Sequence, residues 1–162
     1  MSPFNIERAF KWKRERGWDT LYIAVDFHDC LFAGKYSTDQ ELVLAPYAGS
    51  VLRWATLRPD IKLIAFTCSY AKDFNRVNKW LHGHGIHFDY LNCNPECGNT
   101  DLASFSKKFY FNILLDDKAG FECETDWSLI IKELQRIGEW NLEELQQKRI
   151  DAGLNLEYTP EK

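Results

Sequence analysis

A short apolar run that is followed at once by acidic residues constrains this sequence more than any other feature. Leu21–Val25 reads Leu-Tyr-Ile-Ala-Val, and Asp26-Phe-His-Asp29 comes directly after it. A run this short, with β-branched and aromatic side chains, is typical of a fully buried strand in a parallel sheet. Ligands of open α/β sheets bind beyond the carboxyl ends of the strands, so Asp26 is predicted at that edge, with His28 and Asp29 on the loop above. Asp26 is therefore a candidate nucleophile or metal ligand.

Three further apolar segments are predicted to be strands, namely 61–66, 86–91 and 109–115. Helices are predicted around them from apolar positions three and four residues apart and from capping and stop residues. They are expected over 2–16, from Pro46 to Arg58, over a stretch that ends at Gly83, from Asp126 to Gly138, and from Asn141 onward. The alternation of strands and helices predicts an α/β fold with a parallel, helix-flanked sheet.

The composition is that of one globular domain. The chain has 162 residues, of which 45% are hydrophobic and 27% charged, so it is long enough for a sizeable core. The five cysteines are odd in number and scattered, unlike a disulfide scaffold. No run approaches the length of a membrane span, and the first residues lack a basic-then-apolar signal. We expect a protein of the reducing cytoplasm with no membrane partner.

Charge places weak limits on partners. The net charge of −4 argues against nucleic acid being held by the whole surface, but a local basic patch remains open. The end of the first predicted helix is basic and aromatic, with Lys11, Trp12, Lys13, Arg14 and Arg16. A solvated helix end, favoured by the helix dipole, is the preferred interpretation, and contact with a phosphate backbone is the alternative.

Polar residues follow three of the predicted strands, and two lysines precede the last one. The set is Asp26 and His28, Thr67, Asp116 and Asp117, with Lys107 and Lys108. The carboxyl ends of parallel strands meet at one edge of a sheet, so these residues can converge. Carboxylates gathered there repel one another unless a hard cation lies between them, and oxygen ligands suit Mg²⁺. Together with a hydroxyl and an ammonium group, they describe a phosphoryl site.

In this order the residues resemble the motifs of the haloacid dehalogenase superfamily of aspartate-nucleophile hydrolases. Asp26-Phe-His-Asp-Cys-Leu31 is similar to the first motif, Asp-x-Asp-x-Thr/Val-Leu, and Thr67 stands where the second has Ser or Thr. Lys107 or Lys108 takes the place of the lysine that precedes the fourth motif. Ile113-Leu-Leu-Asp-Asp-Lys-Ala-Gly120 is similar to that motif, an apolar strand that ends in paired aspartates. The match is in register over residues 21–120.

The resemblance implies a three-layer, Rossmann-like α/β fold with a mostly parallel sheet and a Mg²⁺-dependent phosphatase activity. Asp26 would attack phosphorus and form an aspartyl-phosphate. Thr67 and a lysine would bind the phosphoryl oxygens; Lys108 is preferred because it lies nearer the strand, and Lys107 stays open. The implied magnesium ligands are the Asp26 carboxylate, the backbone carbonyl of His28, and Asp116 with or without Asp117.

The sequence departs from the family at His28, which stands where the second aspartate of the first motif acts as general acid and base. The metal contact at this position is a backbone carbonyl and so survives the change. Because a histidine titrates near pH ~6.5, we hypothesise that His28 takes over the proton transfer. Asp29 is the second candidate for that role. The plainer alternatives are a solvent-facing His28 and an Asp117 that only braces Asp116 or caps the next turn.

The length of the segment that follows the first motif limits how the site can be covered, and so which substrates it can take. Only ~15 residues separate the first motif from Pro46, room for a flap around 31–45 and for no cap domain. We expect one domain over 1–152 and a flexible tail over 153–162. In the resembled family, capless members tend to act on large substrates or to borrow a lid from a second subunit. The implied substrate is thus a phosphomonoester, either a small molecule such as a nucleotide or a nucleic-acid end, and a homo-oligomer remains open.

Three rival interpretations remain. A phosphotransferase or a dehalogenase could use the same scaffold, and an inactive domain of this fold could bind a partner through its aromatic face. A zinc site is the third, because five possible ligands fall within sixteen residues: His82, His84, His87, Cys93 and Cys97. Their spacing is irregular, so turn residues and buried thiols are preferred. Cys30 and Cys68 lie near the predicted site, where packing is the default role for a cysteine.

Overall fold

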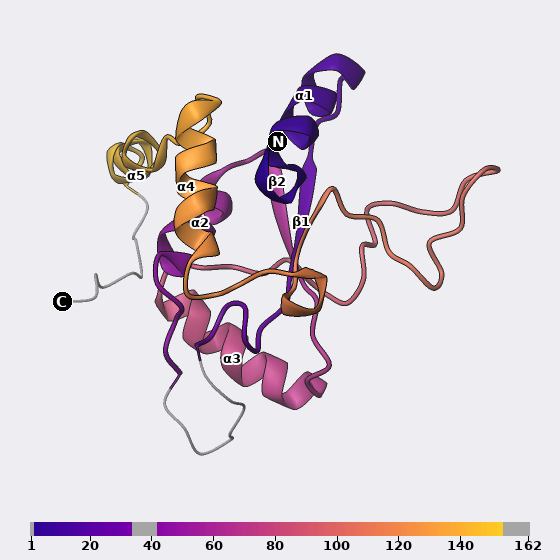
Figure 1. Cartoon of the computed structure of the whole chain (residues 1–162), viewed down its shortest axis with the longest axis horizontal. Coiled ribbons are helices and arrows are strands. Elements are labelled where there is room, and N and C mark those ends of the chain that lie inside the picture. The colour runs from indigo at the N-terminus through magenta and orange to yellow at the C-terminus, as the bar shows by residue number, and fades with distance from the viewer. Residues whose placement is uncertain (1, 34–41, 154–162) are drawn as a thin grey trace.

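The computed structural model describes residues 2–33 and 42–153 (Figure 1). Most of the predicted flap and nearly all of the predicted tail therefore lie outside the described residues. The described chain runs η1 (Pro3–Asn5), α1 (Ile6–Arg16), β1 (Leu21–Val25), α2 (Ala48–Leu57), β2 (Ile61–Ala65), α3 (Ala71–Gly83), β3 (Tyr90–Leu91), β4 (Ile113–Leu115), η2 (Asp117–Ala119), α4 (Asp126–Arg136) and α5 (Leu142–Asp151). No helix in these ranges is long and apolar enough to cross a membrane.

The four strands form one all-parallel sheet in the order β3-β2-β1-β4. Five helices flank this sheet, so the predicted α/β, Rossmann-like fold is confirmed and is consistent with three layers. In the register of the sheet, Val25 pairs with Ala65 on one side and with Leu115 on the other. Strands β1, β2 and β4 therefore end level, and the residues that follow them share one edge.

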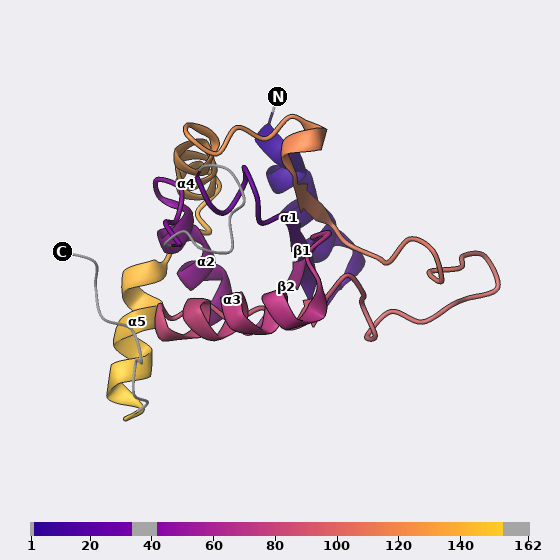
Figure 2. The same ribbon diagram turned by 90° about the horizontal axis from the view of Figure 1, so that it is seen from below.

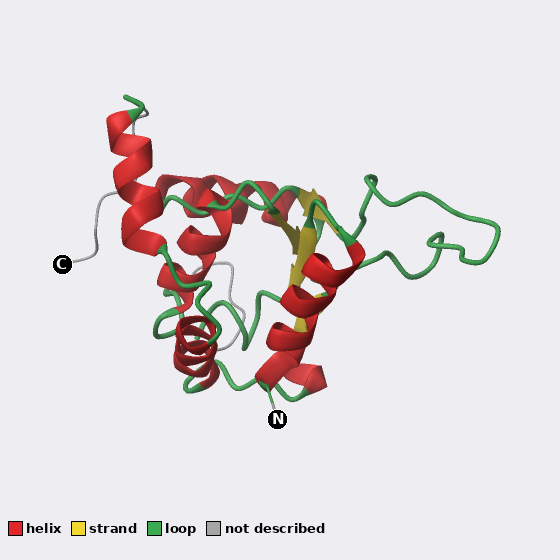
Figure 3. Cartoon of the chain, turned by 90° about the horizontal axis from the view of Figure 1, so that it is seen from above, coloured by secondary structure: helices red, strands yellow, loops and turns green. Residues whose placement is uncertain are grey.

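Side chains alternate along β1 and divide the core into two clusters. Leu21, Ile23 and Val25 point into the larger cluster, which holds the apolar faces of α1 to α4. Tyr22 and Ala24 belong to a smaller cluster on the opposite face of the sheet. Aromatic residues of the segment 92–112 cover this face, and the rest of that segment projects away from the helices (Figures 2 and 3). These aromatic residues are Phe109, Tyr110 and Phe111.

Two predicted strands are shorter than the apolar pattern suggested. Strand β4 begins at Ile113 rather than at 109, because residues 109–111 pack sideways onto the sheet instead of pairing with it. Strand β3 begins at Tyr90 rather than at 86. Ile86 and Phe88 are buried in the larger cluster without joining the sheet. Apolar character alone did not separate buried loop residues from strand residues here.

The predicted helices are confirmed, with one difference at the start of the chain. The segment predicted as a single helix over 2–16 begins with the 3₁₀ turn η1, and Phe4 and Asn5 have positive φ angles of 54° and 62°. The Ser2 hydroxyl accepts a hydrogen bond from the backbone N–H of Glu7 at 3.1 Å, so it satisfies a donor in the first turn of α1. At the other end Gly17, with φ 65°, closes α1 and leads to β1.

Candidate functional site

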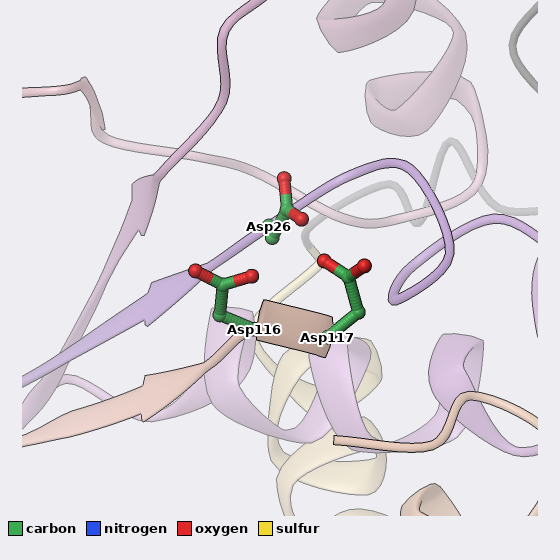
Figure 4. Close-up of side chains that lie close together, drawn as sticks. All are labelled: Asp26, Asp116 and Asp117. Atoms are coloured by element: carbon green, nitrogen blue, oxygen red, sulfur yellow. The ribbon is translucent and has the colours of Figure 1, made fainter. Parts of the chain in front are cut away.

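Three carboxylates meet at the carboxyl edge of the sheet (Figure 4). Asp26 follows β1, Asp116 follows β4, and Asp117 begins η2. One oxygen from each of the three side chains lies within 4.8 Å of the others. All three residues are at least partly withdrawn from solvent. The level ends of two neighbouring parallel strands thus bring together acidic residues that are 90 positions apart (116 − 26) in the sequence.

Backbone hydrogen bonds hold the carboxylates in place. The N–H of Asp26 donates to the carbonyl of Leu115 at 2.9 Å, which extends the β1–β4 ladder by one residue. The N–H of Phe27 donates to Asp26 Oδ1 at 2.8 Å, and the N–H of Lys118 donates to Asp116 Oδ1 at 3.0 Å. The carboxylates of Asp26 and Asp116 are therefore aligned by the turns that follow their own strands.

Burial and the closeness of the three carboxylates determine the electrostatics of this cluster. Burial, the hydrogen bond with Asp117 and the charge of Asp116 together raise the pKa of Asp26 to about 7, although the N–H of Phe27 opposes the shift. Burial also acts to raise the pKa of Asp117, but hydrogen bonds from Lys118 and Asp26 outweigh it and leave that pKa below its usual value. Close oxygen ligands that repel one another are the donor set of a hard divalent cation. These residues could hold one.

A second polar group lies on the loops after β1 and β2. The hydroxyl of Thr67, a residue only 7% exposed, donates to the Ser69 hydroxyl at 3.0 Å. The Nε2 of His28 lies 3.2 Å from the same Ser69 oxygen. Burial lowers the pKa of His28, against the charge of Asp29. The Asn92 side chain fixes the strand end, since it accepts from the N–H of Thr67 at 2.9 Å and donates to its carbonyl at 2.6 Å.

The structure brings most, but not all, of the predicted site residues together. Asp26, Asp116 and Asp117 form the carboxylate cluster, while His28 and Thr67 are joined through Ser69. The remaining two, Lys107 and Lys108, are exposed in the projecting segment 92–112. Within the described residues, neither lysine forms an ion pair or hydrogen bond with these carboxylates.

Three residues near the site were not assigned a role from the sequence, namely Ser69, Asn92 and Lys118. Each has a local signal that could have found it. Ser69 is the second hydroxyl after the end of β2, and Asn92 directly follows β3. Lys118 comes immediately after the paired aspartates, and its Nζ lies 3.0 Å from Asp117 Oδ2. Polar residues at strand ends are informative even when they lie outside a known motif pattern.

The five residues of the alternative zinc site do not converge on one point in the structure. In the described part of the chain, the carboxylate cluster is the one group of three or more potential ligand side chains with converging atoms. The ring of His84 instead stacks on Trp80, with ring centroids 3.9 Å apart. His87 Nε2 lies 3.7 Å from Asp89. Cys30 is buried, where its thiol donates to the Leu115 carbonyl and burial raises its pKa. It has the packing role expected of it.

Comparison with known proteins adds information on the fold alone. No protein-family model matches this chain, and no curated protein matches its sequence. A solved structure of a conserved protein from Bacteroides thetaiotaomicron is similar, with a TM-score of 0.54. The two chains are 20% identical, and the similarity covers 74% of this chain and 92% of the other. At that identity the similarity supports the shared fold.

Proposed function

We propose that this protein is a Mg²⁺-dependent phosphomonoester hydrolase of the haloacid dehalogenase type. The observation that carries the proposal is the meeting of Asp26, Asp116 and Asp117 at the carboxyl ends of β1 and β4. Such a set suits phosphoryl transfer, since a cation there would offset both the carboxylates and the phosphoryl group. The five cysteines are free thiols, which supports a reducing, cytoplasmic location.

The cation would be held by the carboxylates of Asp26 and Asp116, with Asp117 and the backbone carbonyl of His28 as further oxygen donors. When bound, it would supply positive charge to the phosphoryl oxygens and favour the ionised form of Asp26. This matters because the nucleophile must be a carboxylate, and without a cation burial and the neighbouring Asp117 and Asp116 raise the pKa of Asp26 to about 7.

The reaction would run in two displacements on phosphorus. In the first, an Asp26 carboxylate oxygen forms a bond to phosphorus as the bond from phosphorus to the alcohol oxygen breaks. The departing oxygen takes a proton from the protonated His28 ring. In the second, water attacks the aspartyl-phosphate, gives its proton to His28, and releases phosphate with Asp26 restored. The Ser69 hydroxyl, 3.2 Å from His28 Nε2, would orient the ring during both transfers.

The substrate we would test first carries its phosphate on a nucleotide or at a nucleic-acid end. Among the described residues between β1 and α2 and between β3 and β4, no further sheet forms a cap domain over the carboxyl edge. A site without a cap domain suits a bulky phosphomonoester, or a lid contributed by a second subunit.

The proposal is tested by hydrolysis of p-nitrophenyl phosphate with and without Mg²⁺. We expect turnover that requires Mg²⁺ and falls by on the order of 10³-fold or more in Asp26→Asn, because the nucleophile is removed. Asp19→Asn is the matched control, since Asp19 is an exposed aspartate just before β1 rather than after it. Thermal unfolding checks that the variants are folded. Turnover in Asp26→Asn equal to that of the wild type would contradict the proposal.

Two further functions are to be tested, because His28 stands where the hydrolases of this type have an acid/base aspartate. A dehalogenase would release halide from a haloacid through the same Asp26, and a phosphotransferase would pass the phosphoryl group to an alcohol rather than to water. Halide release and phosphorylated product, measured beside phosphate release, separate these activities. A folded protein that binds Mg²⁺ but turns over none of these substrates would instead be a binding domain.

A further inference from the structure

Lys118 is held at the carboxylate cluster at both its ends. Its backbone N–H donates to Asp116 Oδ1 at 3.0 Å, and its Nζ pairs with Asp117 Oδ2 at the same distance. The side chain is otherwise open, with 87% of its surface exposed. Lys118 is the middle residue of η2, the 3₁₀ turn that ends at Gly120 with a φ of 91°. The main chain thus positions the start of this side chain beside the cluster, and its ammonium group pairs with Asp117 while it remains accessible from solvent.

The two lysines predicted from the sequence are placed differently. Lys107 and Lys108 are exposed in the segment 92–112, which projects from the body on the side away from the helices (Figures 1 and 2). The next three residues, 109–111, pack on the second face of the sheet. The carbonyl of Tyr110 is also tied to Asn94 by a hydrogen bond of 2.9 Å, so the two limbs of the segment are joined.

We propose that Lys118, rather than Lys107 or Lys108, is the cation that contacts the phosphoryl oxygens at this site. The inference rests on the proposed phosphatase function. A bound phosphoryl group would compete with Asp117 for the ammonium, and the flexible four-carbon stem of a lysine allows that exchange. Lys118 would form no covalent bond. It would donate a hydrogen bond to a non-bridging oxygen and stabilise the negative charge of the transition state.

Alanine and arginine variants of Lys118 test this assignment. We expect Lys118→Ala to lower kcat/KM for p-nitrophenyl phosphate by about 10²–10³-fold, as the loss of one charge-stabilising donor does elsewhere. Lys118→Arg should recover at least tenfold of that loss. The loss in Lys118→Ala should exceed the loss in a Lys107→Ala/Lys108→Ala double variant by tenfold or more. Lys79→Ala, which removes an exposed lysine of α3, is the matched control and should behave as wild type.

Binding of inorganic phosphate in the presence of Mg²⁺, measured by calorimetry, separates this inference from the proposed function. We expect Lys118→Ala to weaken phosphate binding by tenfold or more without weakening Mg²⁺ binding. If the wild-type protein hydrolyses nothing but shows this dependence, the phosphatase proposal fails and the assignment of Lys118 stands. The assignment is overturned if the wild-type protein does not bind phosphate, or if Lys118→Ala binds phosphate equally well. It is also overturned if phosphate binding is lost in the Lys107→Ala/Lys108→Ala double variant instead.

Discussion

At the scale of single residues, His28 is connected to the loop after β2 through the Ser69 hydroxyl. Its ring reaches Ser69, whose hydroxyl in turn accepts from Thr67, so the loops after β1 and β2 are connected by side chains. In the proposed site the cation would be bound by the backbone carbonyl of this residue, and every amino acid has such a carbonyl. Changing the ring therefore tests proton transfer without removing a metal ligand.

Substrates that differ in their leaving group isolate this role. A p-nitrophenolate ion departs without a proton, whereas the phenolate of phenyl phosphate needs one. We expect His28→Ala to lower kcat/KM for phenyl phosphate by about 10²-fold or more, and for p-nitrophenyl phosphate by less than about tenfold. Equal losses for both substrates would exclude His28 as the acid. A similar pattern in Asp29→Asn, with wild-type behaviour in His28→Ala, would transfer the role to Asp29.

The residues of the site were predictable to the extent that they are tied to strand ends. Asp26, Thr67 and Asp116 follow apolar runs, so the register of a parallel sheet places them at one edge. Ser69 and Lys118 lie one or two residues farther along, where the turn decides which side chain points to the site. Lys107 and Lys108 precede the fourth strand as the motif pattern requires, but sequence order does not specify the path of the segment 92–112 that carries them.

At the scale of elements, α4 anchors the loop that carries Asp26. Trp127 in its first turn is fully buried, and its indole N–H donates to the carbonyl of Cys30 at 2.8 Å. The ring also packs edge-on against Phe121, with ring centroids 5.0 Å apart. A single indole therefore holds the first turn after β1 in contact with the helix that follows β4.

Trp127→Phe should destabilise the protein through this contact. It leaves the Cys30 carbonyl buried without a donor, and we expect the free energy of unfolding in urea to fall by about 1–3 kcal/mol. The control is Trp12→Phe, at a half-buried indole on α1 that stacks under Arg16 at 4.2 Å; its cost should stay below about 1 kcal/mol. Equal destabilisation by both changes would show that the Trp127 hydrogen bond contributes nothing measurable.

Element boundaries were less predictable than element types. The apolar periodicity of α2, α3 and α4 predicted helices close to their observed positions, because one buried stripe on a helix has an unambiguous period. The run over 109–115 predicted one long strand, since aromatic and β-branched residues favour strands. Its first half packs onto the sheet from outside instead, and nothing local distinguishes a residue within a sheet from one that covers it.

At the scale of the whole molecule, a group of charged side chains joins the far edge of the sheet to the helices. Asp60, just before β2, accepts from the Arg58 guanidinium at 2.8 Å and pairs with Lys13 of α1 at 3.2 Å. Arg58 also pairs with Glu139, between α4 and α5, at 2.9 Å. Burial alone would raise the pKa of Asp60, but Arg58 and Lys13 outweigh it and hold that pKa below its usual value.

A depressed carboxyl pKa makes stability depend on pH in a defined direction. The stabilisation from Asp60 is fully present above the pKa that this group has in the unfolded chain, and it is lost as pH falls through the lower folded value. We expect Asp60→Asn to lower the free energy of unfolding by about 1–3 kcal/mol at pH 7. The difference from wild type should stay constant from pH 7 to about pH 5 and shrink only below that, as measured by urea unfolding down to about pH 2. A constant difference would contradict the ionic origin.

The short outer strands have a consequence for self-association. The sheet ends in the two residues of β3 on one side and the three of β4 on the other. Unpaired amide and carbonyl groups on an outer strand are a template for a foreign chain, and very short outer strands are a known protection against it. A second copy of this protein would gain few backbone hydrogen bonds by extending such a sheet, so we expect any dimer that shelters the site to be held mainly by side-chain contacts.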